Sequence, residues 1–351
     1  MIGAAQYGQD ISTSTSNTGG VGWRAPPYAP VPSAAPAVLA LAVVVGACAA
    51  APPMTPTPAA PPWPEARADA DLQAAVEALA QGFDGVVGVY ARHLPTGRTA
   101  TLRADDTFPT ASLVKVPILA TLFEQIEAGA FAYDQELALA DAPPYPHADV
   151  GLVGKLRPDA TVAVHTLAEE MVAASDNTAS FWLQHAVGGG AAVNDWLGRR
   201  GYETTRVNSR TPGREDAYAA FGWGQTTPRE IAGLLRQIVE GGAVSPAADL
   251  EMHRLLTRTH WDDEAVSAVP PGVQVASKQG SVMESRSEVA YVHAPSGPYV
   301  FAVVTRDQGD TRYAPDNAGY ELIRAVSRLL WDTFEPGRSW TAPPGSERYR
   351  F

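Results

Sequence analysis

The segment Phe108-Pro109-Thr110-Ala111-Ser112-Leu113-Val114-Lys115-Val116-Pro117-Ile118-Leu119 is the most informative stretch of this sequence. Its apolar residues continue at helical spacing to Ile126, which predicts a buried helix that ends near Gly129. Ser112 falls in the first turn of that helix, and Lys115 lies one turn further along the same face. Burial lowers the pKa of a lysine, and a neutral lysine can take the proton of a serine hydroxyl. The segment therefore predicts a nucleophile and its base, although by itself it fits a capping serine and a surface lysine as well.

The overall composition limits the kinds of site that the chain can carry. Its 351 residues include 38 acidic and 26 basic side chains, a formal net charge of -12. This balance disfavours a nucleic-acid partner, because nucleic-acid-binding proteins usually carry a basic stripe. Cys48 is the one cysteine, so neither an intrachain disulfide nor a thiolate metal cluster can form. The seven histidines are scattered, without an HxxH or HxH pair, and we expect neither a metal nor a cofactor.

Lysine is scarce among the basic residues. Lys115, Lys155 and Lys278 are the three lysines of the sequence, and arginine fills the other basic positions. Unlike arginine, lysine can lose its proton at accessible pH. A lysine retained among so many arginines is therefore a candidate for proton transfer.

The first 68 residues are predicted to serve export rather than to fold. Residues 34–47 are almost wholly small and apolar, too short to span a bilayer as a helix but of the length of a secretory signal. They lead into Cys48, in a sequence that resembles the lipobox of bacterial lipoproteins, in which cleavage leaves the cysteine as the lipid-bearing first residue. We expect a lipoprotein-type signal peptide over 1–48, an Ala/Pro-rich linker over 49–68 and a membrane attachment by the lipid alone. A plain signal peptide with an incidental cysteine is the alternative, since the positively charged leader is nearly absent.

Residues 69–336 are predicted to form the folded domain, followed by a tail at 337–351. Strand patterns occur at both ends of this domain and helical patterns between them, which predicts an α+β fold, an α/β sandwich. We expect one antiparallel sheet from both chain ends, flanked by helices, with an all-helical insertion at about 132–261. The strands are expected at 85–91, 98–102, 273–279, 288–293 and 299–305, and the last helix at 317–334. Helix starts are expected at a capping box from Thr166 to Glu169, at Thr227 before Pro228, and at Ser245.

Two further motifs follow the first in a fixed order. Ser175-Asp176-Asn177 lies about sixty residues after Ser112, and Lys278-Gln279-Gly280-Ser281 lies on a predicted strand about a hundred residues later. With this order of SxxK, SDN and a lysine–glycine strand, the sequence resembles the serine β-lactamase and penicillin-binding family, above all the class A β-lactamases. The resemblance covers nearly all of residues 69–334.

The resemblance implies a role for each matching residue. Ser112 would be the acylated nucleophile and Lys115 its proton partner, while Ser175 would relay a proton to the leaving nitrogen. The backbone N–H groups of Ser112 and Ser281 would form an oxyanion hole. The other residues would contact the substrate or supply charge. Asn177 would hydrogen-bond substrate or Lys115, Lys278 and Arg286 would attract the substrate carboxylate, and Tyr145 would line the mouth of the cleft. Arg286 can equally be read as a surface residue at a strand entrance.

Two departures from the family pattern concern the mechanism. Gln279 stands where the family usually has Thr or Ser, and it lacks their hydroxyl. Thr211 falls where class A enzymes carry the Ω-loop Glu that positions the deacylating water, and threonine is no base at neutral pH. Glu215 or Asp216 could replace it by a movement at Gly213, although both are equally read as solvated loop acids.

The sequence thus predicts a serine hydrolase that opens β-lactam amides through a Ser112 acyl-enzyme. A hydrolase or peptidase for another amide or ester, such as a cell-wall D-amino-acid peptide, is one alternative. A second is an acylatable penicillin-binding receptor that deacylates poorly, because a well-placed base is worth roughly 10²–10⁴ in rate. We expect an exported, extracytoplasmic monomer.

Overall fold

The computed structural model describes residues 63–144 and 151–349 of the chain. All of them belong to one compact unit that spans Ala60–Phe351. Cys48 and Tyr145 lie outside the described residues, as does the predicted signal peptide. No helix within the described ranges is long and apolar enough to cross a membrane. The boundaries expected for the linker, the helical insertion and the tail stay predictions.

A six-stranded sheet forms the centre of the fold, with strands from both ends of the chain. Its strand order is β1-β3-β2-β11-β10-β9, antiparallel throughout except for the parallel pair β1 and β3. The strands are β1 (Arg67–Ala68), β2 (Val86–His93), β3 (Arg98–Leu102), β9 (Val275–Val282), β10 (Ser285–Val292) and β11 (Tyr299–Arg306). The predicted α+β fold is confirmed, because the first and last parts of the folded chain meet at the pair β2 and β11.

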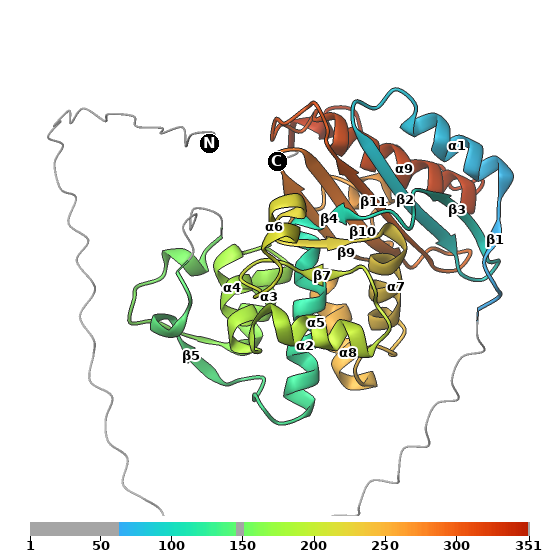
Figure 1. Cartoon of the computed structure of the whole chain (residues 1–351). Coiled ribbons are helices and arrows are strands. Elements are labelled where there is room, and N and C mark those ends of the chain that lie inside the picture. The colour runs from blue at the N-terminus through green and yellow to red at the C-terminus, as the bar shows by residue number, and fades with distance from the viewer. Residues whose placement is uncertain (1–62, 145–150, 350–351) are drawn as a thin grey trace, which may run out of the picture. The chain divides into compact units, whose positions relative to one another are not determined.

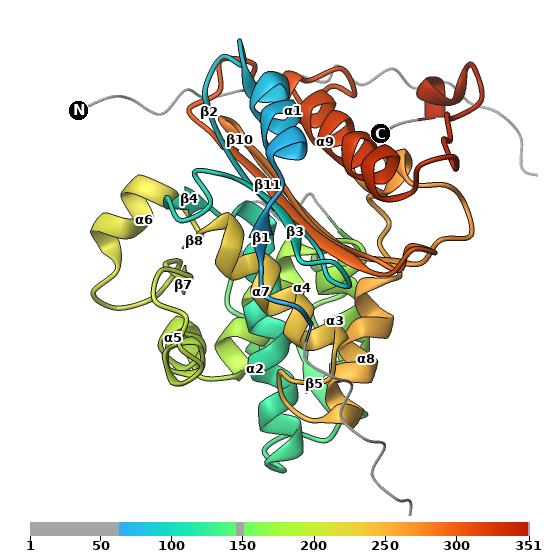
Figure 2. The ribbon, with the colours of Figure 1, turned by 90° about the vertical axis from the view of Figure 1, so that its right-hand side faces the viewer.

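Helices cover both faces of this sheet (Figures 1 and 2). One face carries α1 (Ala70–Ala80) and α9 (Ala318–Phe334), and α7 (Pro228–Val239) packs on the other. Side chains of β11 alternate between two cores: Phe301 and Val303 face α1 and α9, while Ala302 and Val304 face the other helices. This period of two is the pattern of a strand that is buried on both faces.

The helix α2 (Lys115–Glu127) runs through the middle of the helical part. Every residue from Lys115 to Phe123 is buried, as expected for a helix that is apolar on all sides. The helices that contact it are α3 (Val164–Val172), α4 (Asn177–Ala186), α5 (Gly189–Arg199), α7 and α8 (Pro246–Leu256). The helix that follows Ser112 and carries Lys115 is therefore held from several sides.

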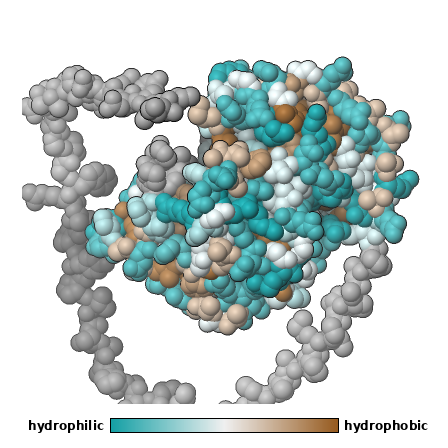
Figure 3. All heavy atoms as spheres, in the orientation of Figure 1, coloured by the Kyte–Doolittle hydropathy of each residue, from teal (hydrophilic) through white to brown (hydrophobic). Residues whose placement is uncertain are grey.

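Short elements complete the described fold. They are β4 (Phe108–Pro109), β7 (Arg206–Val207) and β8 (Gly224–Thr226) in one small sheet, β5 (Glu136–Ala138) and β6 (Thr161–Ala163) in another, and α6 (Glu215–Phe221). Hydrophilic residues are interspersed with small hydrophobic patches on the face in Figure 3. The large apolar clusters lie inside, between the sheet and the helices.

The helix starts agree with the sequence in two of three places. Thr227 accepts a hydrogen bond from the N–H of Glu230 at 3.1 Å, and Ser245 accepts one from Ala248 at 3.2 Å. The capping box predicted at Thr166 is wrong, because α3 already begins at Val164. The strand β6 leads directly into that helix, and the hydroxyl of Thr166 hydrogen-bonds His165 instead of a backbone N–H.

Candidate active site

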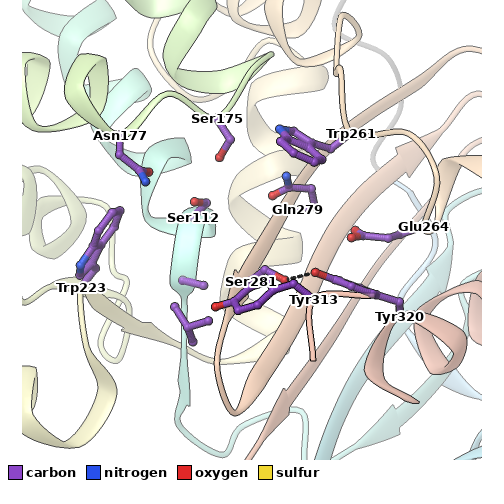
Figure 4. Close-up of a pocket in the computed structure, with 12 residues that line it drawn as sticks. Ser112, Ser175, Asn177, Trp223, Trp261, Glu264, Gln279, Ser281, Tyr313 and Tyr320 are labelled. Carbon is purple, nitrogen blue, oxygen red and sulfur yellow. Dashed lines mark hydrogen bonds between the residues drawn. The ribbon is translucent and has the colours of Figure 1, made fainter. Parts of the chain in front are cut away.

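A pocket of ≈ 380 Å³ brings the three predicted motifs together (Figure 4). Five predicted site residues line it: Ser112, Ser175, Asn177, Gln279 and Ser281. They come from the turn before α2, the loop before α4 with the first residue of that helix, and β9, which are far apart in the sequence. The other lining residues are Ala111, Trp223, Trp261, Glu264, Val282, Tyr313 and Tyr320.

Ser112 lies in a single 3₁₀ turn, Ala111–Val114, which continues into α2. The sequence predicted an α-helical first turn; the tighter 3₁₀ turn is a common form of a helix N-terminus. Ala111 has φ 45°, a strained conformation for a residue with a Cβ, directly before the nucleophile. Strain of this kind persists only where the surrounding packing imposes it.

The strand β9 passes very close to the nucleophile turn. A Cβ built on Gly280 would lie 2.8 Å from the backbone N of Ser112 and 2.8 Å from the carbonyl O of Thr110. Only glycine allows this approach of two backbones. It brings the backbone of Ser112 beside the strand that carries Ser281. These are the two residues whose backbone N–H groups are expected to form the oxyanion hole.

Lys115 is completely buried and its Nζ makes four hydrogen bonds. Nζ lies 3.1 Å from Ser112 Oγ, 2.9 Å from Ser175 Oγ, 2.7 Å from the Ser175 carbonyl O and 2.8 Å from Asn177 Oδ1. Burial, followed by the nearby charge of Lys278, lowers the pKa of Lys115 well below its usual value, while Asp176 opposes the shift. The geometry and the charge both favour an unprotonated amine beside the nucleophile.

Ser175 lies between the two lysines. Its Oγ accepts a hydrogen bond from Lys278 Nζ at 3.1 Å, on the opposite side from Lys115. Its φ of 59° is a left-handed conformation that few residues other than glycine adopt. The turn directs both the hydroxyl and the carbonyl of Ser175 toward Lys115, and the N–H of Asp176 caps the preceding turn by donating to Glu170 O at 2.9 Å.

Lys278 is also completely buried, so its side chain does not line the pocket. Burial lowers its pKa to about 7, against the opposing charges of Glu264 and Glu288. Gln279 turns its side chain onto this lysine, because Nζ of Lys278 donates to its Oε1 at 3.2 Å and to its carbonyl O at 2.9 Å. The amide thus supplies an acceptor where the family has a hydroxyl.

The structure does not bring an Ω-loop acid into the pocket. Thr211 is buried and its hydroxyl donates to the carbonyl of Ser209 at 3.0 Å. Glu215, a predicted catalytic residue, is exposed at the first position of α6, where its carboxylate accepts the N–H of Gly213 at 3.1 Å. Neither residue lines the pocket, and Asp216 is exposed as well. This position lends no support to the predicted catalytic role of Glu215 and fits the alternative reading, a solvated loop acid, whose carboxylate is held by the backbone at the start of α6.

Arg286 is neither a surface residue nor a residue of the pocket wall. Its side chain is 0% exposed and donates to the carbonyls of Val282, Ser285 and Arg312. The guanidinium lies 4.7 Å from the ring centre of Tyr313 and 4.9 Å from that of Tyr320. The predicted contact of Arg286 with a substrate carboxylate is corrected to a contact with the back of two tyrosines that line the pocket.

Several lining residues carried no recognisable pattern in the sequence. Trp223, Trp261, Glu264, Tyr313 and Tyr320 come from four separate segments, and only the tertiary structure brings them around Ser112. Tyr320 shares a hydrogen bond of 2.6 Å with Ser281 (Figure 4). Spacing along the chain cannot reveal contacts between segments so far apart.

Comparison with known proteins gives matches over the same region. The model of the beta-lactamase enzyme family matches residues 71–334. A β-lactamase of Streptomyces fradiae is 29% identical over 273 residues, which cover 74% of this chain and 85% of that protein. The solved structure of PBP-A is similar, with 28% identity, a TM-score of 0.68, and coverage of 78% of this chain and 99% of that one. A mutant of PBP-A, solved as an acyl-enzyme complex with penicillin G, matches with 27% identity and a TM-score of 0.68 over the same shares.

Proposed function

Because this chain belongs to the beta-lactamase enzyme family, we propose that it is a serine hydrolase that opens β-lactam amides through an acyl-enzyme on Ser112. One observation carries the proposal: the buried Nζ of Lys115 lies 3.1 Å from Ser112 Oγ, and its pKa is lowered well below the usual value. A neutral amine at that distance can act as the base that activates the hydroxyl.

The hydrogen bonds of Lys115 fit a neutral amine. Its two N–H groups donate to acceptors that carry no proton, the carbonyl of Ser175 and Oδ1 of Asn177. One lone pair is then left for a hydroxyl proton, from Ser112 or from Ser175. Both N–H donors and the lone pair of the neutral amine are therefore used, and the amine does not need to be protonated to make these contacts.

Acylation then proceeds in two steps. Ser112 Oγ attacks the carbonyl carbon while its proton passes to Nζ of Lys115, and the backbone N–H groups of Ser112 and Ser281 stabilise the oxyanion. As the oxyanion collapses, the C–N bond breaks and the nitrogen takes the proton of the Ser175 hydroxyl. Ser175 regains a proton from Lys115, which restores the neutral amine.

Deacylation is the slow half of the proposed reaction. Among the described residues that line the pocket, Glu264 is the one carboxylic acid, and neither Thr211 nor Glu215 belongs to that set. A missing base costs roughly 10²–10⁴ in rate. The acyl-enzyme is therefore expected to persist, which makes the protein as much an acylatable receptor as a turnover enzyme.

Intact-protein mass spectrometry with benzylpenicillin and nitrocefin tests this proposal. We expect a one-to-one adduct that needs Ser112, is absent in Ser112→Ala and decays over hours. Rapid return to the free mass with steady nitrocefin turnover would instead make the protein an efficient β-lactamase. The absence of any Ser112 adduct with a panel of penicillins and cephalosporins would refute the acyl-enzyme.

A peptidase or esterase acting on a cell-wall D-amino-acid peptide is the second candidate. Gln279 and the buried Arg286 favour it, because both change the groups that would hold a β-lactam carboxylate. Turnover of D-amino-acid peptides or of esters by the wild type, lost in Ser112→Ala, would support this function. Inactivity on all of them would remove it.

We further propose that the protein is exported, monomeric, and anchored by a lipid on Cys48. The support is the sequence before and at that cysteine. Metabolic labelling with an alkynyl fatty acid should mark the wild type but not Cys48→Ala. Sedimentation of the lipid-free domain should give the monomer mass, and a dimer mass would contradict the monomeric state.

A further inference from the structure

The charges on the pocket wall differ from those that the family resemblance implies. Of the twelve described residues that line the pocket, Glu264 is the one with a charged side chain, apart from the phenols. Lys115, Lys278 and Arg286 are buried behind the wall and are not among the lining residues. A substrate group at the Glu264 end therefore meets a carboxyl group first.

Glu264 is poorly satisfied by its own protein. Its side chain is 7% exposed, and its Oε2 is buried without a hydrogen-bond partner among the described residues. Figure 4 shows the carboxyl group directed into the pocket, between Gln279 and Tyr320. A buried polar atom without a partner is costly, and a bound ligand can supply the missing hydrogen bond.

Aromatic rings line the pocket beside this carboxyl group. Trp261 and Tyr320 lie on either side of Glu264 in Figure 4, and Tyr313 lines the wall next to Ser281. Aromatic faces together with a carboxylate attract cations and N–H groups. Arg286 does not compete for the carboxyl group, because its guanidinium is bonded to backbone carbonyls and packed against Tyr313 and Tyr320.

We propose that Glu264, Trp261, Tyr313 and Tyr320 form a subsite that binds an N–H donor of the substrate, a protonated amine or a carboxamide, and disfavours a free carboxylate. The inference rests on the proposed function, since acylation of Ser112 is what reports binding in this subsite. It narrows the substrate class to amides whose group at this end is cationic or neutral.

The surroundings of Glu264 give the subsite a pH dependence. Burial, followed by the charges of Glu288 on β10 and of Asp263, raises the pKa of Glu264 well above its usual value. Lys278 on β9 and Arg324 on α9 oppose that shift, and Tyr320 on α9 is the further titratable group at the subsite. As the pH rises, the ionised carboxylate attracts an amine and repels a substrate carboxylate. Lys115 acts on all three substrates alike. Lys278, whose pKa is lowered to about 7, also loses charge over this range, so the contribution of Glu264 is the part of the ratio that Glu264→Gln removes.

Three penicillins with the same ring and side chain test the proposal: benzylpenicillin, its primary carboxamide and its 2-aminoethyl amide. The rate of Ser112 acylation is followed by rapid-quench mass spectrometry at about pH 6 and about pH 8.5, where an alkylamine stays largely protonated. At the higher pH we expect both amides to acylate the wild type about tenfold faster than the free acid does. A tenfold ratio of rates is the size of effect that one buried charge contact produces. The ratio of aminoethyl amide to acid should rise with pH.

Glu264→Gln keeps the shape of the side chain and removes its charge. We expect it to bring the three rates to within about threefold of one another and to weaken the pH dependence of their ratios. Glu127→Gln is the matched control, because it makes the same change in net charge at the exposed last residue of α2 and should leave the ratios unchanged. The wild-type ratios stand by themselves if Glu264→Gln fails to fold.

Equal or faster acylation by the free acid in the wild type would overturn the subsite, as would unchanged ratios in a folded Glu264→Gln protein. Absence of an adduct with all three compounds would instead contradict the proposed function. The two failures are therefore distinguishable.

Discussion

The Nζ atoms of Lys115 and Lys278 both lie within hydrogen-bond distance of the same atom, Oγ of Ser175, at 2.9 and 3.1 Å. Two ammonium groups on one hydroxyl in a buried site repel each other strongly. The pKa of both amines is lowered by burial, and that of Lys115 is lowered further by Lys278. This shared contact supports the proposed division of roles, in which Lys115, with the more strongly lowered pKa, accepts the proton and Lys278 is the amine that can carry a charge.

Lys115→Arg should fold but lose acylation by a factor of roughly 10²–10⁴. Arginine keeps its proton at any accessible pH and cannot take one from Ser112. The measurement is the rate of adduct formation with benzylpenicillin, with circular dichroism as the control for folding. Acylation at the wild-type rate would refute the base role.

Lys278→Met should move the acidic limb of the acylation profile to higher pH. The charge of Lys278 lowers the pKa of Lys115, so its removal lets that pKa rise. Acylation needs the neutral amine, and a higher pKa therefore demands a higher pH. The check is the pH dependence of acylation of wild type and variant; an acidic limb at unchanged or lower pH would contradict the proposed coupling.

Gly280→Ala should slow acylation by about 100-fold or more and lower the melting temperature. The new Cβ would meet the backbone of Ser112 and Thr110 at 2.8 Å, so that the nucleophile turn and β9 must separate. Overpacking of this kind costs about 1–3 kcal/mol.

Gly233→Ala is the control for that substitution. It lies in α7, and a Cβ there meets no atom within 4 Å. The substitution should stabilise the fold by roughly 0.5–1 kcal/mol and leave acylation unchanged. Thermal unfolding and the acylation rate of both variants decide the comparison. Normal acylation by Gly280→Ala would show that the close approach is not needed.

Arg286→Lys should destabilise the protein without changing the preference between acid and amide substrates. A lysine loses the planar set of donors to four carbonyls and the contacts with two tyrosine rings, which costs about 2–4 kcal/mol. The measurements are the free energy of unfolding and the ratio of acylation rates for benzylpenicillin and its carboxamide. A decrease in the rate of acylation by the free acid alone would show that Arg286 is a carboxylate-binding residue after all.

Stability should fall on acidification partly because of His253 and His293. Their Nε2 atoms lie 3.2 Å apart, and burial lowers the pKa of both, with the charge of His293 adding to the effect on His253. The unfolded chain, with histidine pKa values near 6.5, then binds more protons than the folded one. Stability is therefore present above about pH 6.5 and decreases as the pH falls through the lowered values.

His253→Gln tests this origin of acid sensitivity. Between about pH 7.5 and about pH 5, the melting temperature of the variant should decrease less than that of the wild type. The same loss in both proteins would place the acid sensitivity elsewhere in the fold.

The motifs of the sequence were sufficient for the family and the fold class. Ser112, Lys115, Ser175 and Lys278 were assigned from short motifs in a fixed order, and these four residues do meet in one hydrogen-bonded network. Strand ends at 98 and 102 and the caps at Thr227 and Ser245 were also predicted correctly, because alternation and capping are local properties.

The residues whose role depends on their neighbours could not be assigned in this way. Arg286 was predicted either at the substrate carboxylate or on the surface, and it is buried behind Tyr313 and Tyr320. Glu215 was predicted either to reach Ser112 or to be a solvated loop acid, and it lies exposed on α6. Both are charged side chains with long reach, and what they contact is set by packing rather than by position in the chain.

The sequence by itself determined the catalytic chemistry of this protein: a serine, two lysines and a second serine at the spacings of a known family. The tertiary structure decided the charge of the pocket. It buries Lys115, Lys278 and Arg286, leaves Glu264 on the wall and keeps Glu215 and Asp216 outside the pocket. The reason is physical: a motif fixes which atoms can react, whereas the ionisation and accessibility of a side chain depend on desolvation and on neighbours from distant segments.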